Sequence, residues 1–352
     1  MEHNNAIQIN RLASPTWRHL KMNYAEIARE EYTETLTPSA VIPTGVTLSE
    51  PHGAAPFRTG GGDELSALLD RSGVSETVFT ASESVNEPLR LDYDFTDGTN
   101  AAHRVGIATA PHTAVTAVAF YTAAHDAQGR AAIQTRLNAA EGAKIHFIQV
   151  IRVGADFALI NDIGTTQAEG AQVELTQLYL GGGQVYGGAF AELAGYRSHF
   201  QNDIGYLLKG SESLDINIHT SHSGQKSACD ITAKGVLSDR SRKVFRGAID
   251  FLRGAAGAKG AENEEVLLMS EHAVNQTLPV ILCAEEDVEG SHGASIGRLD
   301  ENTVFYLMSR GLSRESIDKL IARAKIETVM RHITDQPTLD RITGMIGGNA
   351  DE

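Results

Sequence analysis

The sequence has little cysteine: Cys229 and Cys283 are the only two among its 352 residues. They lie far apart, and neither stands in a CxxC motif or at a Cys/His spacing typical of metal ligands. Disulfide-rich folds need several cysteines, and a structural zinc site needs about four ligands at short spacings. A disulfide framework and a self-contained zinc site are therefore both poorly supported.

Positive charge and aromatic side chains are also scarce. Lys and Arg number 30 against 45 Asp and Glu, which leaves a formal net charge of −15, and no run is rich in Lys or Arg. Such a surface repels phosphates, so we expect no direct binding to nucleic acid or to anionic membranes. Aromatic residues are 6 %, whereas apolar residues are 41 % and glycines number 34. This balance predicts a folded chain with a core of small and β-branched side chains and many tight turns.

Signals of membrane insertion, secretion and common catalytic motifs are absent as well. No apolar run approaches the ~20 residues needed to span a bilayer, and the first residues, MEHNNAIQIN, lack the cationic start and apolar stretch of a signal peptide. There is no GxxxxGK[ST], GxSxG or HExxH motif. The glycine-rich run at 181–188 is interpreted as a turn. We expect a soluble cytoplasmic protein without a P-loop nucleotide site.

Short strands dominate what is present, from about residue 76 to 282. Apolar and polar residues alternate there between Gly, Asn and Asp, which is typical of strands. The clearest examples are 77–81, 89–95, 113–123 and 144–153. A weak repeat relates 133–150, 161–178 and 202–219, with irregular spacing. A strand–turn–strand array favours a parallel β-helix, although a large antiparallel sandwich or barrel would produce similar strands.

Helices are expected on both sides of this region. Residues 10–35 read as helical, with Ser14 as cap, Pro15 at the first turn and an apolar stripe that includes Trp17. Residues 38–75 read as connecting chain with a short helix at 63–71. The predicted division is therefore 1–75 as a helical and linker region, 76–298 as the core, and 299–352 as a helical region.

The C-terminal helices have clear boundaries in the sequence. Asp300 caps a first helix that stops near Gly311, Ser313 caps a second, and a third covers 338–346. These helices could cap the end of a solenoid or form a docking surface for a partner.

Residues of chemical interest cluster at 283–300, where acidic residues precede His292 in a glycine-rich stretch that we read as a loop. A histidine beside carboxylates can bind a metal or move a proton, but an acidic solvated loop would look the same. His219 and His222 fall on opposite faces of a strand and are interpreted as exposed surface residues. Cys229 reads as a small core residue, and Cys283 stays of interest because it is near His292.

The run 287–313, DVEGSHGASIGRLDENTVFYLMSRGLS, resembles the C-terminal signature of SufB and SufD proteins of the SUF iron–sulfur cluster assembly system. There an SHGA segment is followed by a Gly, a capped helix with Phe-Tyr-Leu, and Ser-Arg-Gly. The segments 15–23 and 231–249 are also similar to that family. The resemblance thus extends from residue 15 to about 332.

The resemblance implies a mainly β fold: a right-handed parallel β-helix core with helical N- and C-terminal regions. It also implies a scaffold rather than an enzyme, which pairs with SufB through the β-helices and docks the SufC ATPase. Phe305, Tyr306, Arg310 and Gly311 would belong to the SufC-docking region. His292 would be a ligand of a transient iron–sulfur cluster shared with SufB. A flavin is possible in the complex, and the chain alone is expected to bind no cofactor.

One position departs from many relatives, in which a Cys directly precedes SHGA, whereas Gly290 stands here. The missing thiolate and the short chain favour the SufD role over SufB. A single imidazole cannot hold a cluster, which takes about four protein ligands, so a partner must supply the rest. Cys283 is a weaker candidate to compensate. Alternatives are a SufB-like self-pairing scaffold and, with less support, a β-helix carbohydrate-active protein.

Overall fold

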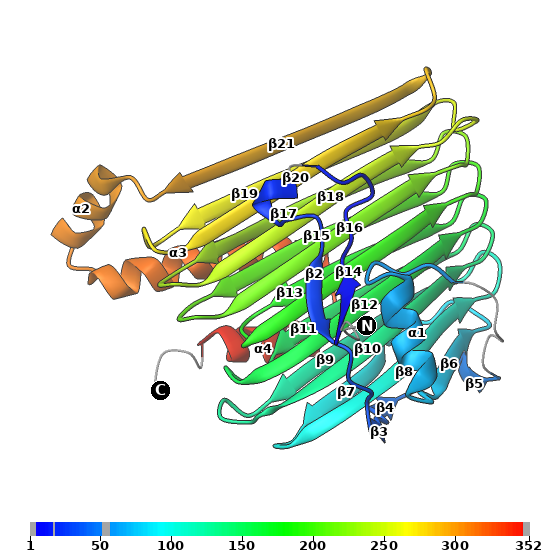
Figure 1. Ribbon diagram of the computed structural model, residues 1–352, viewed down its shortest axis with the longest axis horizontal. Coiled ribbons are helices and arrows are strands. Elements are labelled where there is room, and N and C mark those ends of the chain that lie inside the picture. Colours follow the sequence, from blue (N-terminus) through cyan, green and yellow to red (C-terminus); the bar gives the residue numbers. More distant parts are fainter. Residues whose placement is uncertain (1–4, 17, 51–56, 348–352) are drawn as a thin grey trace.

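The computed structural model describes residues 5–16, 18–50 and 57–347, and its main body is a parallel β-solenoid. The chain alternates between two sheets, so that each coil contributes one strand to each (Figure 1). Sheet I holds β6 (Glu76–Ala81), β8 (Thr99–Thr109), β10 (Gly129–Ala139), β12 (Phe157–Gln167), β14 (Gln184–Leu193), β16 (Ser213–His222), β18 (Arg242–Phe251) and β20 (Val274–Cys283). Sheet II holds β7 (Leu89–Phe95), β9 (Ala114–Ala123), β11 (Lys144–Arg152), β13 (Gln172–Tyr179), β15 (His199–Leu208), β17 (Ala228–Leu237), β19 (Ala258–Leu268) and β21 (Val288–Arg298). The expected mainly β fold with a parallel β-helix core is confirmed, and the antiparallel alternative is wrong.

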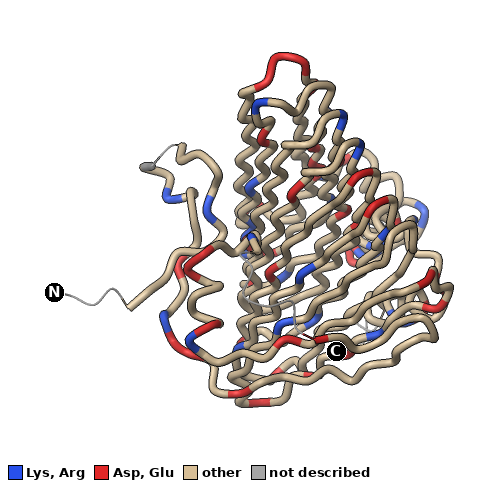
Figure 2. Tube along the Cα trace, turned by 90° about the vertical axis from the view of Figure 1, so that its right-hand side faces the viewer, with Lys and Arg blue, Asp and Glu red and all other residues tan. Residues whose placement is uncertain are grey.

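Alternation within each strand builds the core. Along β15, for example, Phe200, Ile204 and Tyr206 point between the sheets and are fully buried. Inward residues of neighbouring coils stack directly on one another because the strands are parallel and in register. One continuous apolar cluster therefore runs through the coils from β7 to β19. Figure 2 shows the stacked coils from the side, with charged residues scattered over the tube and an acidic loop at its upper end.

The register corrects the repeat inferred from sequence. Ile133 on β10 lies beside Asn161 on β12, so the first two repeat segments are one coil apart. Asn202, which opens the third segment, lies instead on β15 beside Leu175 of β13, in sheet II. The irregular spacing arose because the third segment was aligned half a coil out of phase.

The N-terminal region differs from the expected helix at 10–35. It forms β1 (Ala6–Ile9), a short 3-10 turn η1 (Arg18–Leu20), β2 (Ala25–Ala28) and β3 (Glu34–Thr35), and β1 pairs antiparallel with β2. Trp17 lies outside the described residues. The helical prediction was wrong because Ile27 and Tyr32 pack in the same cluster as Ile160 of sheet I, and tertiary packing overrides a weak helical pattern.

The remaining N-terminal elements close the first coil. The strands β4 (Ser39–Val41) and β5 (Val46–Ser49) pair antiparallel with β7 and β6. The helix α1 (Asp63–Arg71) forms where the sequence predicted it and buries Leu65, Leu68 and Leu69. Gly188, which sequence analysis assigned to a turn, lies inside β14. A side chain there would meet the backbone nitrogen of Gly61 at 2.7 Å, so the glycine allows the chain before α1 to cross sheet I closely.

The C-terminal helices follow the sequence prediction. They are α2 (Glu301–Ser309), α3 (Arg314–Val329), η2 (Met330–His332) and α4 (Gln336–Gly347). Asp300 and Ser313 accept hydrogen bonds from the backbone nitrogens of Thr303 and Ser316, and Gly311 has the positive φ of 93° typical of a helix stop. Buried residues of α3 and α4 pack on the outer face of sheet II, whereas α2 lies past the C-terminal end of β21, to the left of the sheets (Figure 1). No described helix is long and apolar enough to cross a membrane.

Candidate functional site

The solenoid ends at β20 and β21, which form its last coil. Within the described chain each pairs with a single strand, β18 or β19, so both present an unpaired edge. Nearly every residue of β21 is exposed. An unpaired edge offers a row of backbone donors and acceptors and is a template for another strand. The residues singled out by the sequence at 283–298 all lie on this open coil.

His292 lies on β21 and not in a loop, which corrects the sequence interpretation. Its register neighbour on β19 is Glu262, whose own neighbour on β17 is Ile231, a core residue. Because in-register parallel neighbours point to the same side, His292 faces the inside of the solenoid. It is exposed because no further coil of the described chain covers that side.

Cys283 faces the same interior from the opposite sheet. It is the last residue of β20, and its register neighbour is the core residue Phe251. Its thiol is exposed and donates a hydrogen bond to the carbonyl oxygen of Glu285 at 3.0 Å. Gly290 also faces inward, where a side chain would meet Phe251 at 3.0 Å and Ile281 at 3.3 Å. Among the described residues no three His, Cys, Asp or Glu side chains come together as a metal site.

Three charged side chains lie buried directly beneath this open coil, and the sequence interpretation missed them. Lys243 of β18 contacts Glu264 of β19, and both side chains have no exposed area. Glu264 also accepts a hydrogen bond at 2.6 Å from the hydroxyl of Thr277. Glu262, two residues earlier and 3 % exposed, faces the same interior. The signal was available, because Glu262 and Glu264 occupy alternate positions that are apolar in the preceding coil.

Burial shifts the ionisation of these groups. Desolvation raises the pKa of Glu262 to about 7, and the nearby Lys243 charge opposes that rise. Desolvation also holds the pKa of Lys243 well below its usual range. Ionisable groups whose pKa is strongly shifted by burial cluster at functional sites.

The histidine pair at 219 and 222 is not exposed, contrary to the sequence interpretation. His222 is fully buried, with its Nδ1 2.8 Å from the Ser227 hydroxyl and its Nε2 3.2 Å from the Cys229 thiol. His219 is half-buried on the outer face against Phe190. The two residues do point to opposite faces, and Cys229 is the buried core residue expected. Burial lowers the pKa of His222 to about 4 and raises that of Cys229 to about 12, so the pair is neutral.

The proposed docking residues sit on α2 and its end. Phe305 and Tyr306 are 75 % and 55 % exposed, and the Arg310 guanidinium lies 5.2 Å above the Tyr306 ring. Val304 anchors α2, because only 3 % of this residue is exposed. Large apolar side chains that lie side by side and exposed on a helix are typical of an interaction site.

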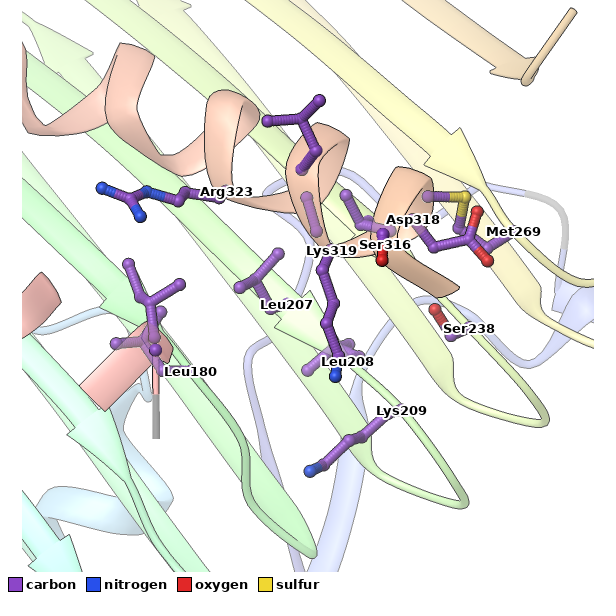
Figure 3. A pocket seen from close by; sticks show the side chains of 15 residues that line it. Leu180, Leu207, Leu208, Lys209, Ser238, Met269, Ser316, Asp318, Lys319 and Arg323 are labelled. Carbon is purple, nitrogen blue, oxygen red and sulfur yellow. The ribbon is translucent and has the colours of Figure 1, made fainter. Parts of the chain in front are cut away.

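A cavity of about 530 Å³ lies beneath α3 (Figure 3). Its floor is apolar and includes Leu207 and Met269, and Lys319 and Arg323 of α3 stand at its rim. Both cations already form ion pairs with glutamates one helical turn away. The cavity therefore shows that α3 covers sheet II incompletely, and it contains no cluster of catalytic side chains.

Together these features define a β-solenoid protein whose last coil is unpaired and carries a histidine and a cysteine on its inner face, and whose helix α2 exposes aromatic side chains. The model of the family described as SUF system FeS cluster assembly, SufBD core domain, matches residues 94–325, more than half of the chain. The chain belongs to this family.

Curated relatives agree with that membership. The chain is 28 % identical over 138 residues to the iron–sulfur cluster assembly protein SufD of Bacillus subtilis, covering 39 % of this chain and 32 % of the relative. It is 32 % identical over 114 residues to SufD of Escherichia coli, covering 32 % and 27 %. A SufBD family protein of Pyrococcus horikoshii is 37 % identical over 101 residues, covering 29 % and 22 %. The alignments thus span about a third or less of each relative's length.

Proposed function

We propose that this chain is a SufD-type scaffold subunit that supports iron–sulfur cluster assembly by pairing with a SufB-type protein and docking a SufC-type ATPase. The observation that carries the proposal is the last coil, where His292 and Cys283 face inward between two unpaired strand edges. Two matched relatives carry the name SufD. On this proposal ATP hydrolysis belongs to the SufC partner.

Pairing through β20 and β21 would bring a second solenoid against the open coil. The edge strands would supply main-chain hydrogen bonds, and His292 would then lie at the seam. Iron–sulfur clusters need about four ligands, mostly thiolates, so the partner would supply most of them. In this proposal His292 is the first candidate ligand from this chain, and Cys283 is the weaker one.

Docking of the ATPase is assigned to the region 299–352, through Phe305, Tyr306, Arg310 and Gly311. The first two offer apolar area, and Arg310 offers a charge stacked on an aromatic ring. Aromatic and Arg side chains are the residues that most often dominate protein–protein binding energy. The helices would thus serve as a docking surface in addition to covering sheet II.

The test is co-purification of this chain with the SufB-type and SufC-type proteins of the same organism, followed by mass determination. A complex with one copy of this chain, one SufB and two SufC is the expected result. A stable homodimer that excludes SufB would instead support a self-pairing scaffold. A chain that stays monomeric in the presence of both proteins would overturn the proposal.

A further inference from the structure

Glu262 occupies the position on the inner face that lies next to His292. The two are register neighbours on β19 and β21, and adjacent strands are about 4.8 Å apart. Their side chains leave the sheet on the same side, so the carboxylate of Glu262 is the nearest inward-facing charge on the sheet beneath the imidazole.

The carboxylate of Glu262 is held in a space that the fold leaves for it. A Cβ on Gly247, across the interior on β18, would lie 2.0 Å from one of its oxygens. Any side chain at position 247 would displace the carboxylate. Glycine at this point of β18 thus leaves room for a buried acidic group.

Two buried carboxyl groups share a single lysine amine beneath the open coil. Lys243 contacts Glu264, which also accepts the hydrogen bond from Thr277. No described residue donates a hydrogen bond to Glu262, and its link to Lys243 is an electrostatic one. A buried carboxylate without a hydrogen-bond donor is costly, so Glu262 has acceptor capacity that the isolated chain does not use.

We propose that Glu262 is a positioning residue for His292: when a partner strand covers β21, its carboxylate accepts a hydrogen bond from one imidazole nitrogen and leaves the other directed at the seam. This inference rests on the proposed role of His292. A histidine that binds a metal through one nitrogen almost always donates its other N–H, commonly to a carboxylate, and this partner fixes the tautomer and the ring orientation.

The alternative role for Glu262 is purely structural, as a second counter-charge for Lys243. The two roles differ in what a substitution changes. A structural carboxylate affects the unfolding midpoint and leaves metal affinity alone. A positioning carboxylate affects metal affinity even where the midpoint is kept.

The experiment compares Glu262→Met, which removes the acceptor, with Glu262→Gln, which keeps an acceptor oxygen, in the complex with the SufB-type partner. Ferrous iron is titrated anaerobically, and the unfolding midpoint of each variant is measured alongside. The Glu262→Met variant should fold, because Lys243 keeps its contact with Glu264 and an apolar side chain suits the interior. The expected result is a loss of iron affinity of about 10- to 100-fold for Met and partial rescue by Gln.

Two controls make the outcomes distinct. Glu289→Gln removes a charge from β21 itself, three residues from His292 and on the outer face, and should leave iron affinity unchanged. His292→Ala sets the lower limit of affinity. If His292→Ala weakens iron binding and Glu262→Met does not, the positioning role is wrong and the proposed function stands. If His292→Ala itself binds iron normally, both are wrong.

Discussion

Arg246 donates two hydrogen bonds to Asp215, at 2.6 and 3.0 Å, and a third to the carbonyl oxygen of Met22 at 2.5 Å. Arg246 is 1 % exposed, and Asn10 donates a further hydrogen bond to the same carboxylate at 2.8 Å. A single ion pair on the outer face of sheet I therefore holds two points of the N-terminal segment against the solenoid.

Replacing Arg246 by Met should destabilise the chain by about 3–5 kcal/mol, because the Asp215 carboxylate would stay buried without its counter-charge. Urea unfolding measures the change in the free energy of unfolding. The matched control is Arg242→Met, on the same face of the same strand. Arg242 is exposed and makes one hydrogen bond to Gln276, so its loss should cost about 0.5 kcal/mol or less. Equal losses for the two variants would show that the N-terminal segment is not held by this ion pair.

The strands and the C-terminal helices were predictable because their signals are local. Alternation marks the strands, and the side chains of Asp300 and Ser313 mark helix starts without reference to the rest of the fold. The N-terminal segment was misread because its partner, sheet I, is distant in sequence. Local pattern alone does not show which residues will cover a sheet, and so does not reveal that Ile27 and Tyr32 will pack there.

The candidate site was only partly predictable for a similar reason. The run around His292 was recognisable by its order of residues. Its neighbour Glu262 was not, because the two become adjacent only through the register of β19 and β21. Sequence alternation shows that a strand has two faces, but it does not say which carboxylates lie on the inner one.

Acid should destabilise the fold through its buried histidines. His103 lies between Thr77 and Tyr93 and is 1 % exposed, and burial lowers its pKa to about 4. Burial also lowers the pKa of His146 and of His222 to about 4. The unfolded chain binds protons on these residues near pH 6.5, and the folded chain does not until about pH 4. The free energy of unfolding should therefore fall as pH drops through this window, by on the order of 3 kcal/mol for each histidine.

Urea unfolding at several pH values between 4 and 7 tests the assignment to His103. His103→Gln should flatten the pH dependence, since glutamine takes up no proton in this range. His272→Gln is the control, because His272 is exposed and its substitution should leave the slope unchanged. An unaltered slope in His103→Gln would show that this histidine is not a source of the acid sensitivity.

The exposed side of α2 should contribute to partner binding and not to the stability of the fold. Phe305→Ser removes an apolar side chain that is 75 % exposed, so the unfolding midpoint should stay within error. Affinity for the SufC-type ATPase should fall by about 2 kcal/mol or more, roughly 30-fold, if Phe305 anchors the interface. Calorimetry with the purified ATPase measures it. The neighbouring Val304→Ser should instead lower the unfolding midpoint, because Val304 is buried. Unchanged affinity in Phe305→Ser would place the docking surface elsewhere.

The two cysteines should report whether the last coil is covered in the complex. Cys283 is exposed, whereas Cys229 is 2 % exposed and burial raises the pKa of its thiol to about 12. Alkylation proceeds through the thiolate, so iodoacetamide should label one cysteine of the native chain and both in urea. Cys283→Ser should abolish the labelling in native conditions.

When a SufB-type partner is bound, labelling of Cys283 should slow several-fold, because the partner's edge strands would cover the inner face of β20 and β21. Mass spectrometry of peptides taken over time measures both rates. Labelling that is equally fast in the complex would mean that the seam does not lie on this coil, and His292 would then have no partner to complete its ligand set.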